Sequence, residues 1–312
     1  MSTNQKNLRA SVIQQQCWPQ KDKNLAESER LIRQAAAAGA ELILLQELHG
    51  SEYFCQTESL AQFDLAEPLE GPTKQLLANL AKELHCVIVG SIFEKRMAGV
   101  YHNTAIVLDS DGSLAGYYRK MHIPDDPGFY EKFYFTPGDA QNPGFSPIQT
   151  CVGKLGVLVC WDQWFPEAAR LMALAGADLL LYPTAIGWDP ADNQEEQQQQ
   201  LDAWQLIQRS HAIANHLPVM AANRTQHEAD PSAQTQGIQF WGNSFICGPQ
   251  GNLLNTANNT EVCVISADID LSRTEHLRKI WPYFRDRRID AYSGLTQRAI
   301  EDAKQQNKGT AT

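Results

Sequence analysis

The part of the sequence that most restricts the possible fold is residues 154–167, where a short apolar run ends at a cysteine. Residues 155–159 are apolar and include two valines, which is typical of a buried strand. Pro166 follows, and proline is favoured at the first position of a helix, where its missing N–H costs nothing. Cys160 is therefore predicted to lie between the end of a strand and the start of a helix.

This predicted position of Cys160 has two interpretations. Open α/β sheets bind their ligands at such strand ends, and free backbone N–H groups in the turn can stabilise an oxyanion. However, free cysteine is also among the most buried residue types, so an inert core thiol is the alternative. The rest of the chain decides between them.

The composition is that of an ordinary globular protein. The chain has 312 residues, of which 43% are hydrophobic and 20% are charged, and no composition break or linker divides it, so a single domain over residues 1–312 is expected. A net charge of −10 argues against nucleic acid or an anionic membrane as a partner and mildly favours a cationic substrate.

Cysteine usage and hydropathy indicate a cytoplasmic protein. The 7 cysteines are scattered and form no CxxC pair, as expected of reduced thiols. The N-terminal residues lack the apolar region of a signal peptide, and no apolar run approaches the roughly 18 residues of a membrane span.

Strands and helices alternate along the predicted chain, as in an α/β protein. Strands are expected at residues 8–14, 41–47, 87–93, 101–108, 115–119, 155–159, 177–183, 219–223, 245–247 and 262–268. Helices are expected at residues 24–38, 71–84, 166–174 and 194–216, with a further helix from Leu271 and a polar, arginine-rich tail at residues 281–312.

Residues 120–145 stand apart because they show no strand or helix pattern. Four prolines interrupt the stretch, and aromatic side chains gather between Phe129 and Phe135. A loop this long inside a domain is usually functional or disordered, and this one is too aromatic to be disordered.

Two segments resemble each other. Residues 36–45 and 172–181 both run from a helix through Ala-Gly-Ala and an acidic residue into an apolar strand. This similarity suggests that the chain consists of two similar halves packed together. The alternative is a coincidental similarity between two ordinary helix-to-strand junctions.

Three predicted strands end in a reactive side chain: Glu47, Lys120 and Cys160. If the strands are aligned, a carboxylate, an ammonium and a thiol would meet at one edge. The ammonium would lower the pKa of the thiol and support an oxyanion, and the carboxylate would act as general acid and base. Alternatively, each charged residue merely begins a solvated loop.

The context of these three residues resembles the nitrilase (carbon–nitrogen hydrolase) superfamily. Glu47 follows an apolar strand, Lys120 stands in Arg-Lys-Met-His, and Cys160 begins Cys-Trp-Asp-Gln-Trp-Phe-Pro-Glu. The resemblance covers about residues 8–295. It implies a four-layer αββα sandwich of two similar halves, a Glu-Lys-Cys triad and assembly into a homo-oligomer, dimer or higher. It also implies an oxyanion site of Lys120 with the Trp161 N–H, and Glu131 as a second glutamate that positions the substrate.

Further stretches are similar to superfamily members that hydrolyse N-carbamoylputrescine. They are residues 122–133, 160–167, 182–187, 222–225 and 281–288. The implied reaction is cysteine-dependent hydrolysis of this small N-carbamoyl amine to putrescine, ammonia and carbon dioxide, in polyamine biosynthesis. Trp188 is bulkier than the resemblance leads us to expect, which bears on the shape of the pocket.

A substrate that ends in an ammonium group requires an acceptor at the far end of the pocket. Candidate acceptors are Asp125, Asp126 and Asp189, and candidate aromatic faces are Tyr53, Phe129, Tyr130, Trp164 and Trp188. Each aspartate is also an ordinary turn residue beside a proline.

No cofactor or metal is expected. The 8 histidines form no ligand set, HExxH is absent, and neither GxGxxG nor GxxxxGK[ST] occurs. The basic cluster at residues 285–288 is expected at an interface or in solvent, and residues 281–312 are expected to pack at an interface.

Two rival functions are considered. The same chemistry on N-carbamoyl-β-alanine or an N-carbamoyl amino acid would require arginine or lysine in the pocket in place of aspartate. A catalytically inactive binding scaffold would need no reactive cysteine, which the presence of Glu47, Lys120 and Cys160 together disfavours.

Overall fold

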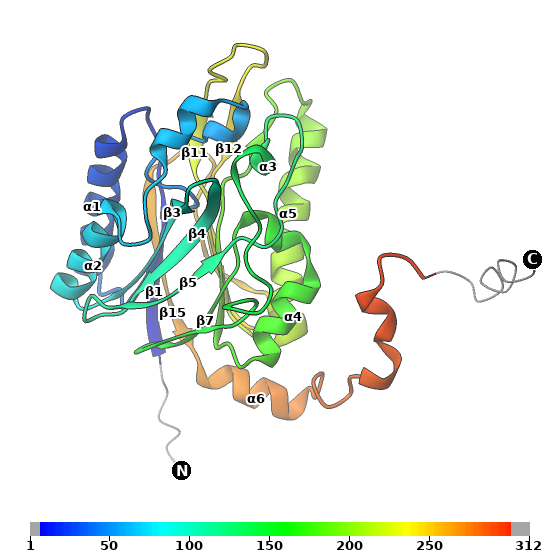
Figure 1. The fold of residues 1–312 in the computed structure, drawn as a ribbon. Coiled ribbons are helices and arrows are strands. Elements are labelled where there is room, and N and C mark those ends of the chain that lie inside the picture. The colour runs from blue at the N-terminus through cyan, green and yellow to red at the C-terminus, as the bar shows by residue number, and fades with distance from the viewer. Residues whose placement is uncertain (1–6, 301–312) are drawn as a thin grey trace, which may run out of the picture.

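Two six-stranded sheets lie face to face in the centre of the molecule, and helices cover the outer face of each sheet (Figure 1). The computed structural model describes residues 7–300. This arrangement of helix, sheet, sheet and helix confirms the predicted four-layer αββα sandwich.

The first sheet contains most of the N-terminal half and one strand from near the C-terminus. Its order is β15-β1-β2-β3-β4-β5. The strands are β1 (Asn7–Gln14), β2 (Leu42–Leu44), β3 (Val87–Met97), β4 (Val100–Leu108), β5 (Leu114–Arg119) and β15 (Cys263–Asp270), and the covering helices are α1 (Lys21–Ala37) and α2 (Pro72–Leu84).

The second sheet is built from residues 148–256. Its order is β14-β13-β10-β8-β7-β6. The strands are β6 (Ile148–Thr150), β7 (Gly153–Val157), β8 (Leu179–Pro183), β10 (Val219–Ala222), β13 (Phe245–Cys247) and β14 (Leu253–Thr256), and the covering helices are α4 (Pro166–Leu174) and α5 (Gln194–Asn215).

The two halves share one topology. In the first, the parallel strands β1, β2 and β3 are connected through α1 and α2, and antiparallel β4 and β5 follow. In the second, parallel β7, β8 and β10 are connected through α4 and α5, and antiparallel β13 and β14 follow. The sequence echo at residues 36–45 and 172–181 therefore marks equivalent helix-to-strand junctions, at β2 and β8.

Burial explains why these segments form sheets. The inner faces of both sheets form one apolar core, to which Val12, Leu44 and Val157 belong. A second core lies between the first sheet and its helices, and Ile43 and Leu77 belong to it. Strands buried on both faces read as continuous apolar runs, which is why the sequence predicted them.

A three-stranded sheet was not predicted. It consists of β9 (Gly187–Trp188), β11 (Thr225–Glu228) and β12 (Ile238–Trp241), in the order β11-β12-β9. These strands have two to four residues each, too few for a period to be recognised. The loop at residues 120–145 also contains one short helix, α3 (Glu131–Tyr134), whose aromatic neighbours pack into a third apolar cluster.

One predicted strand is much shorter than expected. Residues 41–47 were expected to be extended, but β2 ends at Leu44. Beyond it, the Glu47 N–H donates to Thr184 O at the end of β8 (3.4 Å), and Leu48 adopts a φ of 49°. The chain therefore leaves the first sheet at this point and turns towards the second.

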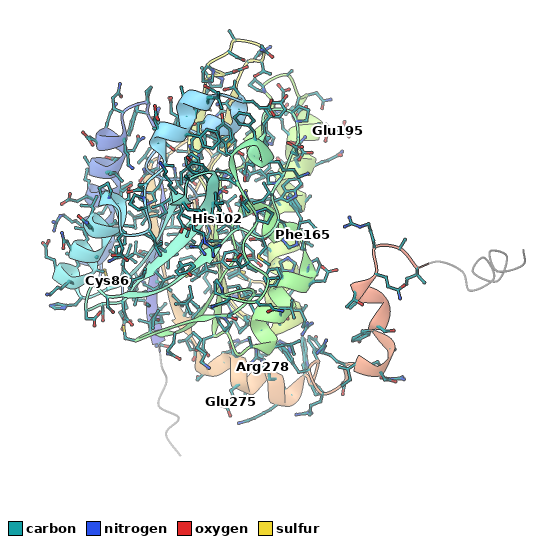
Figure 2. The ribbon with its side chains drawn as sticks, viewed as in Figure 1. Cys86, His102, Phe165, Glu195, Glu275 and Arg278 are labelled. Atoms are coloured by element: carbon teal, nitrogen blue, oxygen red, sulfur yellow. The ribbon has the colours of Figure 1, made fainter. Side chains whose placement is uncertain are left out.

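The C-terminal segment lies at one end of the sandwich. Helix α6 (Ser272–Ile280) follows β15, and the chain after it extends away from the body (Figure 1). Arg278 of α6, labelled in Figure 2, donates to Asn215 O at the end of α5 (3.0 Å). Within residues 7–300, no helix is long and apolar enough to cross a membrane.

Candidate active site

Cys160 lies at the sharp turn that joins β7 to α4. It begins a short 3₁₀ helix (Cys160–Trp164) and adopts a φ of 43°, a conformation that side-chain-bearing residues rarely take. Its Sγ lies 3.7 Å from Ala185 O, beyond the end of β8. Backbone strain of this kind costs about 1–3 kcal/mol and persists only where the surroundings enforce it.

Asp162 enforces the turn. One carboxylate oxygen accepts the Val159 N–H and the Tyr118 hydroxyl, both at 2.9 Å. The other accepts the His122 N–H at 3.1 Å and lies 2.6 Å from His122 Nδ1. The same buried carboxylate thus ties the turn that carries Cys160 to the end of β5, which carries Lys120.

The His122 ring is also fixed from the other side. It stacks on Phe165, with ring centroids 3.8 Å apart and planes 6° from parallel; Phe165 is labelled in Figure 2. Phe165 directly precedes α4, so this stacking is a second connection between the cysteine turn and the segment after β5.

Lys120 lies between two buried carboxylates. Its Nζ is 2.8 Å from Glu47 Oε1 and 2.7 Å from Glu131 Oε2, and all three side chains are fully or almost fully buried. Tyr53 OH donates to the other oxygen of Glu131 at 2.7 Å. Residues from the ends of β2 and β5 and from α3 therefore meet at one point.

The surroundings shift the titration of these groups. Burial alone would lower the pKa of Lys120, but the carboxylates of Glu131 and Glu47 raise it well above its ordinary value. Burial raises the pKa of Glu131 to about 7, against the opposing effect of Lys120. Burial, followed by the charge of Glu47, raises the pKa of the Cys160 thiol well above its ordinary value. The resting cysteine is therefore a thiol, and its reaction requires a nearby base.

Cys160 and Glu131 open onto a cavity of about 510 Å³. This volume is in the range of small-molecule sites. The described residues that line it are Pro124, Asp126, Pro127, Phe129, Glu131, Cys160, Trp161, Trp164, Ala185, Ile186, Gly187, Asp189, Asp192, Gln200, Ala203 and Trp241. Four of them are carboxylates, and no lysine or arginine is among these described residues.

The structure separates the residues expected to bind substrate into two groups. Trp161, Asp126 and Asp189 line the cavity directly. Tyr53 does not; it is buried behind Glu131 and contacts it through its hydroxyl. Asp125 points elsewhere, towards Lys132 at 3.9 Å.

Trp188 does not narrow the cavity, although its bulk led us to expect an effect on the shape of the pocket. Its ring packs against Trp241 with centroids 5.4 Å apart, and its Nε1 donates to Gln197 O at 2.8 Å. Trp241 is a cavity-lining residue that the sequence analysis did not identify. The sequence analysis did not identify Asp192 either, because its local sequence is equally typical of a loop that caps a helix.

Arg224 was also missed, although it holds the segment after Glu47. Its guanidinium is fully buried and donates to Glu47 O at 2.9 Å and to Leu48 O at 3.2 Å. It pairs with Glu228 at 2.8 Å, and the other oxygen of Glu228 accepts the Tyr53 N–H at 2.6 Å. Residues 222–225 are among the stretches that resemble superfamily members, but no local pattern indicated the contact of Arg224 with Glu47.

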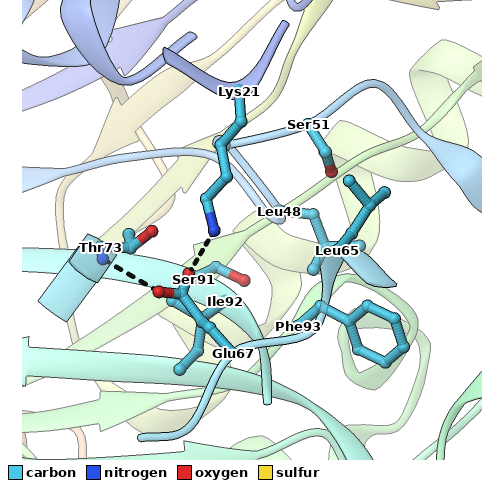
Figure 3. A pocket seen from close by; sticks show the side chains of 10 residues that line it. Lys21, Leu48, Ser51, Leu65, Glu67, Thr73, Ser91, Ile92 and Phe93 are labelled. Carbon is cyan, nitrogen blue, oxygen red and sulfur yellow. Dashed lines mark hydrogen bonds and ion pairs between the residues drawn. The ribbon is translucent and has the colours of Figure 1, made fainter. Parts of the chain in front are cut away.

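A second hollow is too small to be a substrate site. It lies between α1 and β3 and has a volume of about 20 Å³, room for about one water molecule (Figure 3). Its charge is neutralised internally, because Glu67 accepts from Lys21 Nζ and from the Thr73 N–H, both at 3.0 Å. Within residues 7–300, no group of three or more His, Cys, Asp or Glu could hold a metal ion.

Known proteins resemble this chain over most of its length. N-carbamoylputrescine amidase of Oryza sativa subsp. japonica is 44% identical over 287 residues, which cover 91% of this chain and 93% of that protein. Citrullinase of Francisella tularensis subsp. tularensis is 40% identical over 293 residues, 94% of this chain and 99% of that protein.

Solved structures show the same fold. The crystal structure of a carbon-nitrogen hydrolase from Helicobacter pylori matches with a TM-score of 0.91 and 50% identity, covering 94% of this chain and 100% of that one. Residues 9–279 match the family described as carbon-nitrogen hydrolase. The chain therefore belongs to the carbon–nitrogen hydrolase family, within the nitrilase superfamily, and is an amidohydrolase.

Proposed function

We propose that this enzyme hydrolyses N-carbamoylputrescine to putrescine, ammonia and carbon dioxide, with Cys160 as nucleophile, Glu47 as general acid and base, and Lys120 as oxyanion donor. The observation that carries the proposal is the hydrogen-bonded chain from Glu47 through Lys120 to Glu131, beside a cysteine at the wall of an acidic cavity.

In the first half-reaction, Glu47 takes the thiol proton and Cys160 Sγ attacks the ureido carbon. Lys120 and the Trp161 N–H stabilise the oxyanion of the tetrahedral intermediate. Glu47 then gives the proton to the terminal amide nitrogen, which leaves as ammonia, and the carbon stays bound to sulfur as a thiocarbamate.

In the second half-reaction, Glu47 takes a proton from water, and the hydroxide attacks the same carbon. The C–S bond breaks, the proton returns to the sulfur, and the released carbamic acid decomposes to putrescine and carbon dioxide. Glu131, fixed by Tyr53 and Lys120, supports the position of the substrate throughout.

The charge of the cavity supports a substrate with a distal ammonium. Asp126, Asp189 and Asp192 line the cavity, and the aromatic residues Phe129, Trp161 and Trp164 line the same space. A substrate with only a distal carboxylate, such as N-carbamoyl-β-alanine, would meet repulsion there. The same reaction on another N-carbamoyl amine or amino acid is the alternative, and an inactive scaffold is disfavoured by the buried triad.

The test is ammonia release by the purified protein from N-carbamoylputrescine, citrulline and N-carbamoyl-β-alanine in parallel. We expect kcat/KM for N-carbamoylputrescine to exceed that for N-carbamoyl-β-alanine by about tenfold or more, because several acidic side chains line the cavity and each exposed charge pair contributes up to about 1 kcal/mol. A preference for N-carbamoyl-β-alanine would overturn the substrate assignment and leave the roles of the triad in place.

The chemical roles are tested separately with Cys160→Ser. General acid–base and oxyanion contributions are each worth about 10²–10⁴-fold, so loss of the nucleophile should leave almost nothing. Residual activity above about one tenth of wild type, a level these contributions do not allow, would refute the assignment of Cys160.

Three further proposals concern the whole protein. We propose a homo-oligomer, dimer or higher, in which residues after 280 pack at an interface between copies. We propose that residues 1–312 act as one catalytic unit.

The absence of disulfides among the seven cysteines, all of which are described, supports the cytoplasm as the compartment of the protein.

A further inference from the structure

Asn103 is a buried polar residue that the proposed mechanism does not use. It lies on β4 next to His102, which Figure 2 labels, and its side chain is fully buried. Its Nδ2 donates to Glu47 Oε1 at 2.6 Å. It therefore contacts the proposed general base and belongs to a different strand from each of the triad residues.

The two oxygens of Glu47 have unequal surroundings. Oε1 accepts from Asn103 Nδ2 and from Lys120 Nζ, whereas Oε2 is buried and has no hydrogen-bond partner. A buried carboxylate oxygen without a donor is costly, and such exceptions point to a function. Two donors on one oxygen leave the other as the only oxygen free to exchange a proton.

Asn103 is itself held at both ends. Ser91 Oγ donates to Asn103 Oδ1 at 3.4 Å, which orients the amide so that Nδ2 faces Glu47. The carbonyl of Asn103 accepts the Lys120 N–H at 2.9 Å. The same residue thus fixes the carboxylate of Glu47 through its side chain and the start of the Lys120 segment through its backbone.

We propose that Asn103 is a positioning residue that fixes the rotation of the Glu47 carboxylate, so that Oε2 faces the Cys160 thiol and the attacking water. The inference rests on the proposed role of Glu47 as general base. Asn103 acts only through Glu47 and makes no contact with the reacting carbon.

Several charged groups surround Glu47 and must stay constant in a test. Lys120 approaches from the end of β5, Glu131 from α3 and Cys160 from the turn after β7, while Tyr53 stands behind Glu131 and Arg224 holds the Glu47 carbonyl. A substitution at Asn103 removes none of these charged groups, so the amide donor to Glu47 is the group whose loss is tested.

The test uses the rate at which iodoacetamide alkylates Cys160, followed by peptide mass spectrometry as a function of pH. The reaction reports thiol activation without depending on the substrate. Cys151 is exposed and contacts Ser110 and Asp109, which do not belong to the candidate site, so it serves as an internal reference in the same molecule.

Asn103→Leu is close in size but cannot donate. We expect the alkylation rate of Cys160 at neutral pH to fall by about tenfold or more, because the Glu47 carboxylate is no longer held in the orientation that accepts the thiol proton. With substrate, kcat should fall while KM changes little.

Asn103→Asp keeps the shape of the side chain, so it controls for an effect of Asn103→Leu that is caused by misfolding. Aspartate can donate to Glu47 only when protonated, so its alkylation rate relative to wild type should rise as the pH falls. A merely structural role for Asn103 would not produce this reversed dependence.

Thr104→Val is the matched control. Thr104 is the next residue on β4, is equally buried, and donates to the Glu94 carboxylate at 2.6 Å, outside the candidate site. Its loss should leave the Cys160 profile within about twofold of wild type, because the variant removes a hydrogen bond of similar geometry without touching Glu47.

The outcomes separate the two proposals. If Asn103→Leu alkylates as fast as Thr104→Val while Glu47→Gln is slow, the positioning role is wrong and the base assignment stands. If Glu47→Gln also alkylates at the wild-type rate, both the base assignment and the positioning role are overturned.

Discussion

Lys120 is stable in its buried position because two carboxylates share it. Removing Lys120 would leave both buried carboxylates without a cation, and breaking a buried ion pair typically costs about 3–5 kcal/mol. The pair with Glu47 and the pair with Glu131 therefore serve stability and chemistry together. At the residue scale, the site consists of mutually dependent groups, and a single substitution alters its neighbours as well.

The acidic wall of the cavity gives the first prediction. Asp126→Asn and Asp189→Asn should each raise KM for a cationic substrate by about two- to fivefold with kcat unchanged, because exposed ion pairs are worth up to about 1 kcal/mol. Both side chains line the cavity and are exposed. Steady-state kinetics at low salt measure the effect, which should shrink as salt is added.

Asp125→Asn is the control for this prediction. Asp125 neighbours Asp126 in the chain and is also exposed, but it does not line the cavity. Its substitution should leave KM unchanged. If neither Asp126→Asn nor Asp189→Asn changes KM, the ammonium binds elsewhere, and Asp192 is the next residue to substitute.

His49 gives a prediction about pH and stability. Burial, with smaller contributions from Lys21 and Arg224, lowers its pKa from 6.5 to about 3. Between these values the unfolded chain binds a proton that the folded chain does not. Stability should therefore fall as the pH falls below 6.5, with a limiting slope of about 1.4 kcal/mol per pH unit from this residue.

His49→Gln should remove that slope, since glutamine does not titrate and keeps a polar group beside Ser28, whose Oγ lies 3.1 Å from His49 Nδ1. Urea unfolding measured from neutral to mildly acidic pH would show a shallower loss of stability than wild type. The exposed His276→Gln on α6 is the control. Equal acid sensitivity in all three proteins would show that His49 is not the residue responsible.

At the scale of elements, α2 is pressed closely onto the first sheet. Gly90 of β3 faces α2 at a point where an added Cβ would lie 2.4 Å from Leu77 Cδ1 and 3.1 Å from His49 Nε2. Leu77 is fully buried in the core between the first sheet and its helices. The absence of a side chain at this position is therefore what lets the helix approach the strand that follows it.

Gly90→Ala should lower the free energy of unfolding by about 1–3 kcal/mol, as expected for overpacking in a filled core. Gly50→Ala is the matched control, because its Cβ would meet only ordinary contacts, Leu25 at 3.6 Å and Lys21 at 3.9 Å. Urea denaturation of both variants measures the difference. A Gly90→Ala protein as stable as Gly50→Ala would mean that α2 shifts freely, against the packing described here.

The elements also show what a sequence can predict. Buried parallel strands such as β7 and β8 were predicted because burial on both faces leaves a continuous apolar run. The family motifs around Cys160 and Lys120 indicated the fold. By contrast, the roles of Asn103 and Arg224 depend on contacts with Glu47 that are 56 and 177 residues distant along the chain, and no local pattern encodes such pairs.

At the scale of the whole molecule, the candidate site lies between the two halves. Glu47, Lys120 and Glu131 come from the first half or the loop after it, and Cys160 comes from the second. Asp162 and Arg224 cross from the second half to hold segments of the first. The site therefore exists only when both sheets have packed together.

The C-terminal segment gives a prediction about assembly. Ile289 and Leu295 are 74% and 64% exposed, an unusual state for apolar side chains on a free arm. A chain that ends at Ile280 should form a smaller species than the full-length protein, as measured by sedimentation velocity, because the proposed interface is lost. An unchanged mass would place the interface elsewhere.

Polar substitutions refine that test. Ile289→Ser with Leu295→Ser keeps the inner part of the arm, where the Tyr283 ring stacks on His216 at 4.5 Å. This double variant should reduce assembly without altering the secondary structure measured by circular dichroism. If it assembles normally while the truncated chain does not, the contact involves residues after 280 other than Ile289 and Leu295.

The pairing of β1 with β15 has a consequence for how the protein is made. Asn7 to Gln14 pair along their whole length with Asp270 to Cys263. A ribosome that adds about 5–20 residues per second needs roughly 13–50 s to travel between these segments. Throughout that interval, one edge of β1 in the nascent chain has no partner strand. Other chains can add to an unpaired edge of this kind. Strand β15 therefore covers the edge of β1 only late in synthesis. A nascent chain released before β15 has emerged from the ribosome is the form most in need of chaperones.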